Sequence, residues 1–340
     1  MTAFVRSASL GNFAEVSRRH RIDPERLIRG AGLDPAFLAS PDLRIPTASV
    51  VGLLERAARE SGCPTFGLEM AESWRMSDFG AISLLLTHQR TLRDALEATV
   101  RYRHLLNDSL SLSIEEAGEF VIVREELVGE SVASSRQAIE LAIGVVFRMF
   151  RALLGPEWRP RRVQFAHAAP PDLAVHRRVF GRSLAFGSDF NGIVCDAADV
   201  DRPNPSSDPA MAGYARSFVE SLPGAGTPSQ AQDVRRSIYA LLPRGRATID
   251  QVARALGTNP RALQRRLDAS GESFSGLLNG ARRELVLGYL DNPAYSLTQV
   301  AGLLGYTYPS SFTRWFVAEF GKSPARWRAA RARGGIATAR

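Results

Sequence analysis

Lysine is almost absent from this chain of 340 residues: Lys322 is the only lysine among 43 basic residues, and all the others are arginine. Cysteine is nearly as rare, because only Cys63 and Cys195 occur and neither belongs to a paired motif. Such cysteine usage gives no disulfide framework and is typical of proteins in a reducing compartment. The simplest expectation is a cytoplasmic protein.

Several chemical signatures are also missing. No apolar run approaches the roughly 20 residues of a membrane helix, and residues 1–20 lack the apolar stretch of a signal peptide. The five histidines are scattered, without His-Glu-x-x-His or Cys-x-x-Cys spacing, so the spacing predicts no metal site. Because no nucleophile elbow, phosphate loop or dinucleotide fingerprint occurs, we expect neither an enzyme nor a cofactor.

The positive charge is concentrated in the last third of the chain. Residues 228–340 hold 17 basic and 7 acidic side chains, a net charge of +10, whereas residues 1–227 hold 26 and 28, a net charge of −2. A nearly neutral body with a basic tail domain indicates a polyanionic partner for the tail.

Residues 220–232, "ESLPGAGTPSQAQ", contain two prolines and two glycines and lack apolar periodicity, so they are predicted to be a linker between domains 1–219 and 233–332. The first domain mixes helix and strand patterns, which predicts an α+β fold. The predicted helices lie within 46–61, 91–108, 134–155 and 171–181, a hairpin within 109–126, and further strands within 161–168 and 191–199.

A ten-residue pattern occurs twice in the basic domain, as "TIDQVARALG" at 248–257 and "SLTQVAGLLG" at 296–305, identical at five positions. A period of this length suggests a repeated supersecondary unit. Each copy opens with an S/T-x-x-Q capping box and ends in a glycine suited to a left-handed turn. These residues are Thr248, Gln251 and Gly257 in the first copy and Ser296, Gln299 and Gly305 in the second.

A second helix is predicted after each glycine, within 260–270 and 309–320. Asn259 and Pro260 suit the start of the first, and Pro309 suits the start of the second. Two helices joined by a glycine turn form a helix-turn-helix, whose second helix enters the DNA major groove. The core positions of the second helices are Leu263 and Leu267 in one copy and Phe312, Phe316 and Phe320 in the other.

The opposite faces of these second helices carry side chains that suit base edges, since arginine pairs with guanine and glutamine with adenine. A solvated polar face explains one copy equally well, but two copies in register on a basic domain favour DNA binding. The expected base-reading residues are Arg261, Gln264, Arg265, Ser310, Thr313 and Arg314, and the expected phosphate contacts are Thr248, Arg266 and Lys322.

A single helix is predicted between the two copies, over residues 274–290, with Ser273 as its N-cap and Asn292-Pro293 ending it. Such a helix would hold the two recognition helices at a fixed separation. Reading successive major grooves on one side of DNA requires about 34 Å between them. The basic domain is therefore predicted to be all-α, with two helix-turn-helix units joined by a linker helix.

These segments resemble the AraC-type transcription regulators. The resemblance lies in "RALQRRL", "ARRELVLGYL" and "VAGLLGYTYPSSFTRWFVAEFGKSPARWR", with small departures in Trp315 and in Trp327, where the family usually has tyrosine. Residues 165–205 are similar, more weakly, to the arabinose-binding-like effector domain of the ornithine-utilisation and virulence-regulator branch. The resemblance implies a small-molecule effector, a homodimer, contact with RNA polymerase and operator DNA as the partner.

The candidates for the effector pocket are Trp74, Tyr102, His104 and Arg136, although ordinary packing or a surface position accounts for each of them better than a pocket does. The acidic pairs Glu115-Glu116 and Glu125-Glu126 are interpreted as solvated turn and strand ends of the hairpin, and both cysteines as core thiols. Three functions are compatible with these patterns: a ligand-responsive regulator, an architectural DNA-binding protein whose first domain only dimerises, and an enzyme fused to a DNA-binding tail. Base-reading side chains favour the first.

Overall fold

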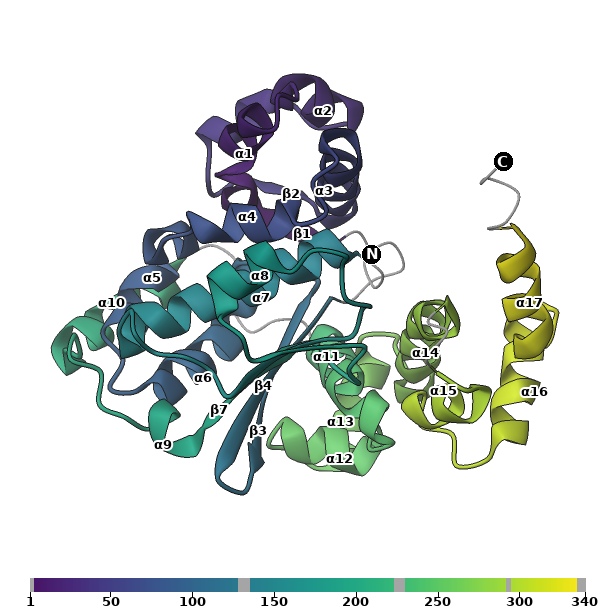
Figure 1. The fold of residues 1–340 in the computed structure, drawn as a ribbon. Coiled ribbons are helices and arrows are strands. Elements are labelled where there is room, and N and C mark those ends of the chain that lie inside the picture. Colours follow the sequence, from purple (N-terminus) through teal and green to yellow (C-terminus); the bar gives the residue numbers. More distant parts are fainter. Residues whose placement is uncertain (1–2, 128–134, 223–229, 292–294, 335–340) are drawn as a thin grey trace. The chain divides into compact units, whose positions relative to one another are not determined.

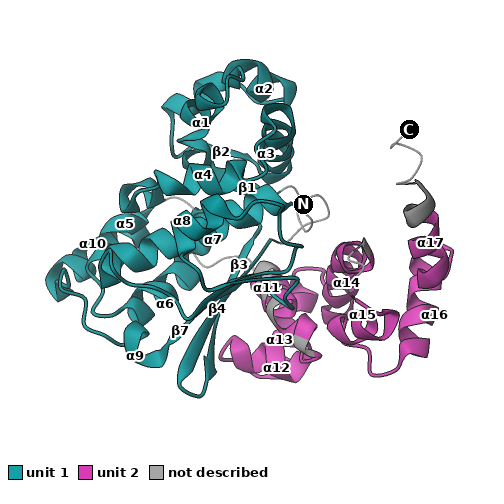
Figure 2. Ribbon diagram, viewed as in Figure 1, with its two compact units in different colours: residues 1–227 teal, residues 228–340 magenta. Residues whose placement is uncertain are grey.

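The computed structural model describes residues 3–127, 135–222, 230–291 and 295–334. The chain divides into two compact units, residues 1–227 and 228–340, which Figure 2 shows in different colours. Within the predicted linker, residues 220–221 belong to the helix that ends the first unit, residues 230–232 belong to the helix that opens the second, and residues 223–229 lie outside the described residues.

A five-stranded sheet organises the first unit, with the strand order β3-β4-β7-β5-β6. The hairpin forms as predicted, with Gly118 in its turn at a φ of 67°, and its strands pair in register from Leu110 opposite Leu127 to Ala117 opposite Phe120. All neighbouring strands are antiparallel except β5 and β6. The strands are β3 (Leu110–Ala117), β4 (Phe120–Leu127), β5 (Arg162–Phe165), β6 (Leu184–Phe186) and β7 (Gly192–Asp196).

The longest helix of this unit, α7 (Arg136–Leu154), packs against the sheet at β4 and β7 and against α3 and α4 (Figure 1). Its apolar residues are distributed widely enough to bury both flanks, and Ile143, Phe147 and Phe150 are each at most 1% exposed. The other helices are α1 (Phe13–Arg19), α2 (Pro24–Gly30), α3 (Thr47–Ser61), α4 (Phe66–Glu72), α5 (Ile82–Thr87), α6 (Leu92–Tyr102), α8 (Ala174–Phe180), α9 (Ala197–Val200) and α10 (Pro209–Ser221).

A close approach between α4 and α7 requires glycine at position 67. A Cβ atom added there would lie 2.1 Å from the backbone oxygen of Gln137, a distance that real Cβ atoms do not tolerate. The Gln137 side chain completes the contact, because its Oε1 accepts a hydrogen bond from the Gly67 N–H at 2.8 Å. This N–H belongs to the first turn of α4 and has no partner within its own helix.

A second, two-stranded sheet joins β1 (Phe4–Arg6) to β2 (Arg44–Pro46) in antiparallel register. Strands of three residues are too short to show a periodic pattern, which is why neither was predicted. The backbone N–H of Arg6 donates to the Leu106 oxygen at 3.0 Å, so this sheet is anchored beside the end of α6.

The second unit is all-α, as predicted. Helix α11 packs against α12, α13 and α14, and α14 in turn packs against α15 and α17. The linker helix α14 covers 18 residues and is therefore about 27 Å long. The helices are α11 (Gln230–Leu241), α12 (Ile249–Ala255), α13 (Pro260–Ala269), α14 (Phe274–Asp291), α15 (Leu297–Leu303), α16 (Pro309–Phe320) and α17 (Pro324–Gly334).

Both helix-turn-helix units have the glycine turn that the repeat predicts. Gly257 has a φ of 62° and Gly305 a φ of 72°, values that favour glycine because it lacks a Cβ atom. Ser296 forms the complete reciprocal capping box with Gln299, whereas Thr248 only accepts from the Gln251 N–H. The side chain of Asn259 caps α13 by accepting from the Ala262 N–H at 2.8 Å, as expected.

The fold class is confirmed: an α+β first unit is followed by an all-α second unit. In the described part of the chain, no helix combines the length and the apolar character that crossing a membrane requires.

Candidate DNA interface and ligand cavity

The two recognition helices, α13 and α16, bury one face and expose the other. Leu263 and Leu267 are fully buried on α13, as are Phe312 and Phe316, to within 1%, on α16. The opposite faces expose Arg261 and Arg265 on α13 and Ser310, Thr313 and Arg314 on α16.

The exposed arginines are free to bind another molecule. Within the described residues, Arg261, Arg265 and Arg314 form no hydrogen bond or ion pair with the protein. A guanidinium group that is exposed and unpaired can dock both of its N–H edges on guanine O6 and N7 without first breaking an internal contact.

Gln264 differs from these arginines because it is half-buried and already engaged. Its Nε2 donates to the Asp268 Oδ1 at 2.9 Å, one turn further along α13. To read an adenine, Gln264 would have to exchange this hydrogen bond for one to the base, so its net contribution to affinity is smaller than that of a free side chain.

The three expected phosphate contacts lie in different settings. Arg266 is exposed on α13, and the hydroxyl of Thr248 is used to cap α12 at 3.3 Å from the Gln251 nitrogen. Lys322 is exposed after α16, and its Nζ lies 4.6 Å from the centre of the Trp327 ring. This cation–π contact orients the ammonium group but leaves its charge available to a phosphate.

Other arginines of this unit hold the helices together. On α14, Arg282 donates through Nε to the Leu304 oxygen at the end of α15 (3.0 Å) and lies 4.2 Å from the Tyr306 ring. Arg328 on α17 donates to the Leu290 and Tyr295 oxygens at 3.1 and 2.8 Å. Some arginines of this unit therefore bind backbone oxygens at the ends of neighbouring helices, and others are exposed to solvent.

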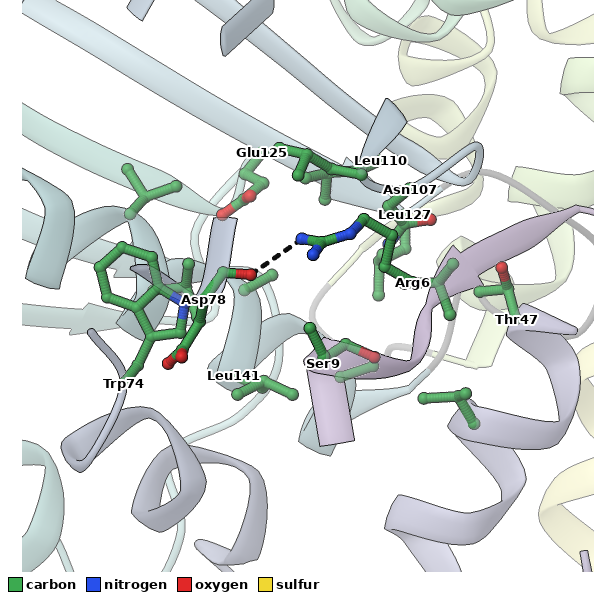
Figure 3. Close-up of a pocket in the computed structure, with 18 of the residues that line it drawn as sticks. Arg6, Ser9, Thr47, Trp74, Asp78, Asn107, Leu110, Glu125, Leu127 and Leu141 are labelled. Atoms are coloured by element: carbon green, nitrogen blue, oxygen red, sulfur yellow. Dashed lines mark hydrogen bonds between the residues drawn. The ribbon is translucent and has the colours of Figure 1, made fainter. Parts of the chain in front are cut away.

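The first unit contains a partly open cavity of about 150 Å³ between α3, α7, the β1 region and the β3–β4 hairpin. A cavity of that volume can hold a molecule about the size of benzene. Its walls are largely apolar, with Val50, Leu54, Leu112, Leu141 and Val145 among them. Figure 3 shows Glu125 extending from the sheet toward the space that Arg6, Trp74 and Asp78 border.

Glu125 lies in the core, so the interpretation of the pair Glu125-Glu126 as a solvated strand end is wrong for Glu125. It is 1% exposed, because strict alternation along β4 places it on the core face with Val121, Val123 and Leu127. The period-two pattern in the sequence already contained this signal. Burial, together with the neighbouring carboxyl of Glu126, raises the pKa of Glu125 to about 8.

Three buried oxygens that border the cavity have no hydrogen-bond partner among the residues that the structure describes. They are the Ser9 Oγ, the Thr47 Oγ1 and the Glu125 Oε2. Buried polar atoms are normally hydrogen-bonded, and each one left unpaired costs on the order of 1–3 kcal/mol. Their clustering around one apolar cavity is the arrangement expected when a bound molecule or ordered water supplies the missing partners.

Arg6 adds a cation at one wall of the cavity. Its Nε and Nη2 donate to the Asp42 Oδ1 at 3.0 and 2.6 Å, and its Nη1 donates to the Asp78 backbone oxygen at 2.9 Å. No sequence pattern marks Arg6, Ser9 or Thr47, because only the tertiary fold brings these residues to the same cavity.

Of the four sequence candidates for the effector pocket, Trp74 lines this cavity and the other three do not. The Tyr102 hydroxyl donates to the Glu220 Oε1 of α10 at 2.9 Å, and the His104 backbone oxygen accepts from Arg44 at 3.0 Å. Arg136 is turned toward the buried Glu140, whose Oε1 lies 2.8 Å from its Nε. Tyr102 and Arg136 therefore form hydrogen bonds within the first unit, away from the cavity.

Two family models match the chain. The arabinose-binding domain of AraC transcription regulators (N-terminal) matches residues 22–204, and a helix-turn-helix domain matches residues 252–330. The first match covers more than half of the chain and contains the cavity's α3, α7 and hairpin walls; the second contains both recognition helices.

The sequences of relatives that match over nearly the whole chain support the same assignment. The regulator VirS of Mycobacterium tuberculosis is 30% identical over 331 residues, which cover 96% of this chain and 97% of VirS. The ornithine utilization regulator of Pseudomonas aeruginosa is 25% identical over 91% of each chain. A crystal structure of the regulator CdpR from Pseudomonas aeruginosa aligns with a TM-score of 0.44 and 20% identity, covering 89% of this chain and 97% of CdpR. The chain therefore belongs to the AraC family of transcription regulators, with an arabinose-binding-like effector domain followed by a helix-turn-helix DNA-binding domain.

Proposed function

We propose that this regulator reads its operator chiefly through Arg265 and Arg314 and binds its effector in the cavity of the first unit. The observation that carries the first part is the matched placement of the two arginines. Each lies two residues beyond a fully buried anchor, Leu263 in α13 or Phe312 in α16, and each is exposed without an internal partner among the described residues. Equivalent positions in two units suit equivalent contacts in successive major grooves.

The effector proposal rests on the three unpartnered oxygens around the cavity. An apolar molecule with one hydrogen-bonding end would bury its body against Leu141 and Val145 and meet Glu125 with its polar group. Because the raised pKa keeps Glu125 largely protonated at neutral pH, its carboxyl can donate to a ligand oxygen. The name of the matching domain does not make arabinose the ligand of this chain.

The rival proposal is an architectural DNA-binding protein whose first unit only dimerises. Such a protein needs phosphate contacts and apolar wedges in the minor groove more than exposed arginines on two recognition helices. It also gives no reason for a cavity bordered by unpaired polar atoms.

A homodimer would use the exposed side of α10. Met211, Tyr214 and Phe218 follow one another at i, i+3 and i+7 on this helix and are 41%, 74% and 51% exposed. The opposite side of α10 is buried through Ala212, Ala215 and Val219. An apolar stripe of this kind can pack against the same stripe of a second copy about a two-fold axis. Contact with RNA polymerase, which the family resemblance implies, is also part of the proposal.

The first prediction separates base reading from charge. Arg265→Ala and Arg314→Ala should each cost about 1–3 kcal/mol on the cognate operator and much less on random DNA, because a base-specific pair is lost. Arg266→Ala and Lys322→Ala, the matched controls, should weaken binding to both DNAs and lower the salt dependence by about one unit of slope. Titrations on operator and scrambled duplexes at several salt concentrations test this. Equal losses on both duplexes for Arg265→Ala and Arg314→Ala would favour the architectural protein.

The second prediction concerns a substitution that fills the cavity. Ala142 of α7 lines it, so Ala142→Phe should abolish the rise in Tm that an effector from a metabolite library produces in the intact chain. Operator binding without effector should persist, because the change lies outside the second unit. Ala36→Phe, at an exposed position of the same unit, should keep the response. A ligand that stabilises Ala142→Phe as strongly as wild type would place the effector site elsewhere.

The third prediction concerns pH. In the folded chain Glu125 keeps its proton up to about pH 8, whereas the unfolded chain loses it near pH 4.5, so the free energy of unfolding should fall as pH rises between these values. The slope from this group approaches about 1.4 kcal/mol per pH unit. Burial raises the pKa of Glu126 to about 7 as well, so this second carboxyl contributes a decline of its own below that pH. Urea unfolding at pH 7 to 8.5 should therefore show the decline in wild type and much less of it in Glu125→Gln. Glu97→Gln removes an exposed carboxyl and should retain the wild-type decline; a wild-type profile from Glu125→Gln would contradict the assignment.

The fourth prediction concerns assembly. Tyr214→Arg places a charge in the middle of the α10 stripe and should shift the sedimentation coefficient from dimer to monomer in the ligand state that dimerises. Leu43→Arg changes a leucine that is also open to solvent, at 50% exposure, outside α10 and should leave the dimer intact. A monomeric wild type in every ligand state, or a dimer that tolerates Tyr214→Arg, would rule out this interface.

A further inference from the structure

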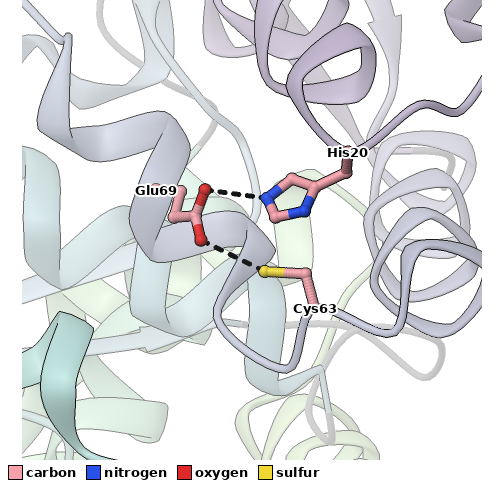
Figure 4. A group of neighbouring side chains, drawn as sticks. All are labelled: His20, Cys63 and Glu69. Carbon is pink, nitrogen blue, oxygen red and sulfur yellow. Dashed lines mark hydrogen bonds and ion pairs between the residues drawn. The ribbon is translucent and has the colours of Figure 1, made fainter.

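Three side chains with metal-ligating atoms meet in the helical part of the first unit. His20 follows α1, Cys63 lies in the turn between α3 and α4, and Glu69 belongs to α4. Their ligand atoms all lie within 4.8 Å of one another. Figure 4 shows the Glu69 carboxylate between the other two, with one oxygen toward the imidazole and the other toward the thiol.

The spacing of these atoms suits a single small cation. The Glu69 Oε2 lies 2.9 Å from the His20 Nε2, and the Glu69 Oε1 lies 3.3 Å from the Cys63 Sγ. In a tetrahedral zinc site, bonds of roughly 2.0–2.3 Å place neighbouring ligand atoms about 3.3–3.7 Å apart. The largest separation among the three ligand atoms is at most 4.8 Å, so side-chain shifts of about 1 Å would bring all three within coordination distance of one ion.

The three side chains are mostly buried, but solvent and small ions have access to them. The side chains of His20 and Glu69 are 27% and 13% exposed, and Cys63 is 6% exposed. Arg19 approaches the Glu69 Oε2 to only 4.0 Å and is half-exposed, so its cation can move into solvent when another positive charge binds. The Phe66 ring, 6.1 Å from the imidazole of His20, closes one side.

A nucleophilic triad and a disulfide switch both fit this cluster less well than a cation does. In a triad the imidazole lies between the thiol and the carboxylate, whereas here the carboxylate lies between them. Burial also raises the pKa of the Cys63 thiol, which makes it a poor nucleophile. A disulfide switch lacks its second thiol, because Cys195 is buried in β7 and its Sγ donates to the Val121 oxygen.

We propose that His20, Cys63 and Glu69 form a Zn²⁺ site, with a fourth position open to water. Imidazole, thiolate and carboxylate are the three side-chain ligands that zinc uses in proteins. On binding, the Cys63 S–H bond breaks, a sulfur–zinc bond forms, and the thiol proton leaves to solvent; His20 binds through the lone pair of Nε2 as the neutral tautomer that carries its hydrogen on Nδ1. The ion would tie the end of α1 to the α3–α4 turn and to α4, and would stabilise the helices that border the cavity without taking part in DNA binding.

The test uses the intact, tag-free chain after metal removal. Zn²⁺ at micromolar concentration should raise Tm by several degrees while Mg²⁺ should not, and Co²⁺ should produce the near-ultraviolet band of a thiolate-to-cobalt charge transfer. Cys63→Ser should remove this band and weaken Zn²⁺ binding by at least about 100-fold, more than the loss of a residue behind the ligands would. Glu69→Gln, which keeps the side-chain size, should weaken Zn²⁺ binding measurably as well.

Cys195→Ser is the matched control, because it removes the only other thiol, which is also buried. It should keep both the cobalt band and the zinc-induced rise in Tm. A wild type without the band, or a band that disappears with Cys195→Ser and persists with Cys63→Ser, would overturn the proposal. Operator binding by the metal-free chain is a separate measurement, so failure of the zinc site leaves the regulatory function unaffected.

Discussion

The close contact between α4 and α7 is the constraint on which the first unit depends. Two glycines permit it: a Cβ atom at Gly67 would meet the Gln137 backbone oxygen, and one at Gly144 would lie 2.5 Å from the Cβ of Ala71. On α7, Leu141 and Val145 line the cavity together with Leu112 and Glu125 of the hairpin, so the contact with α4 also positions one wall of the cavity.

Patterns that depend on local chemistry could be predicted from the sequence. The capping residues, the glycine turns and the alternating hairpin strands all form where the residues indicated, because these features depend on neighbours within a few positions. The exposed arginines of α13 and α16 could also be placed, since a buried anchor fixes the opposite face of a helix.

Features that depend on distant contacts could not be predicted. The cavity joins Arg6, Thr47 and Glu125 from separate segments, and the cluster of His20, Cys63 and Glu69 spans a gap of 43 positions between its first two members. Of the four pocket candidates, Trp74 lines the cavity. Tyr102 instead forms a hydrogen bond with a carboxylate on α10, and Arg136 with one on α7. Only Glu125 had a sequence signal that was overlooked, namely its place in the alternation of β4.

The scarcity of lysine has a practical consequence. Lys322 is the only lysine in the chain, it is exposed, and it lies beside Trp327 in the DNA-binding unit. Amine-directed reagents would therefore modify one side chain of the native sequence. A fluorescent dye attached there would lie next to an indole ring and beside the expected path of the DNA backbone. Operator binding could then be followed by the change in dye fluorescence, without any substitution in the chain.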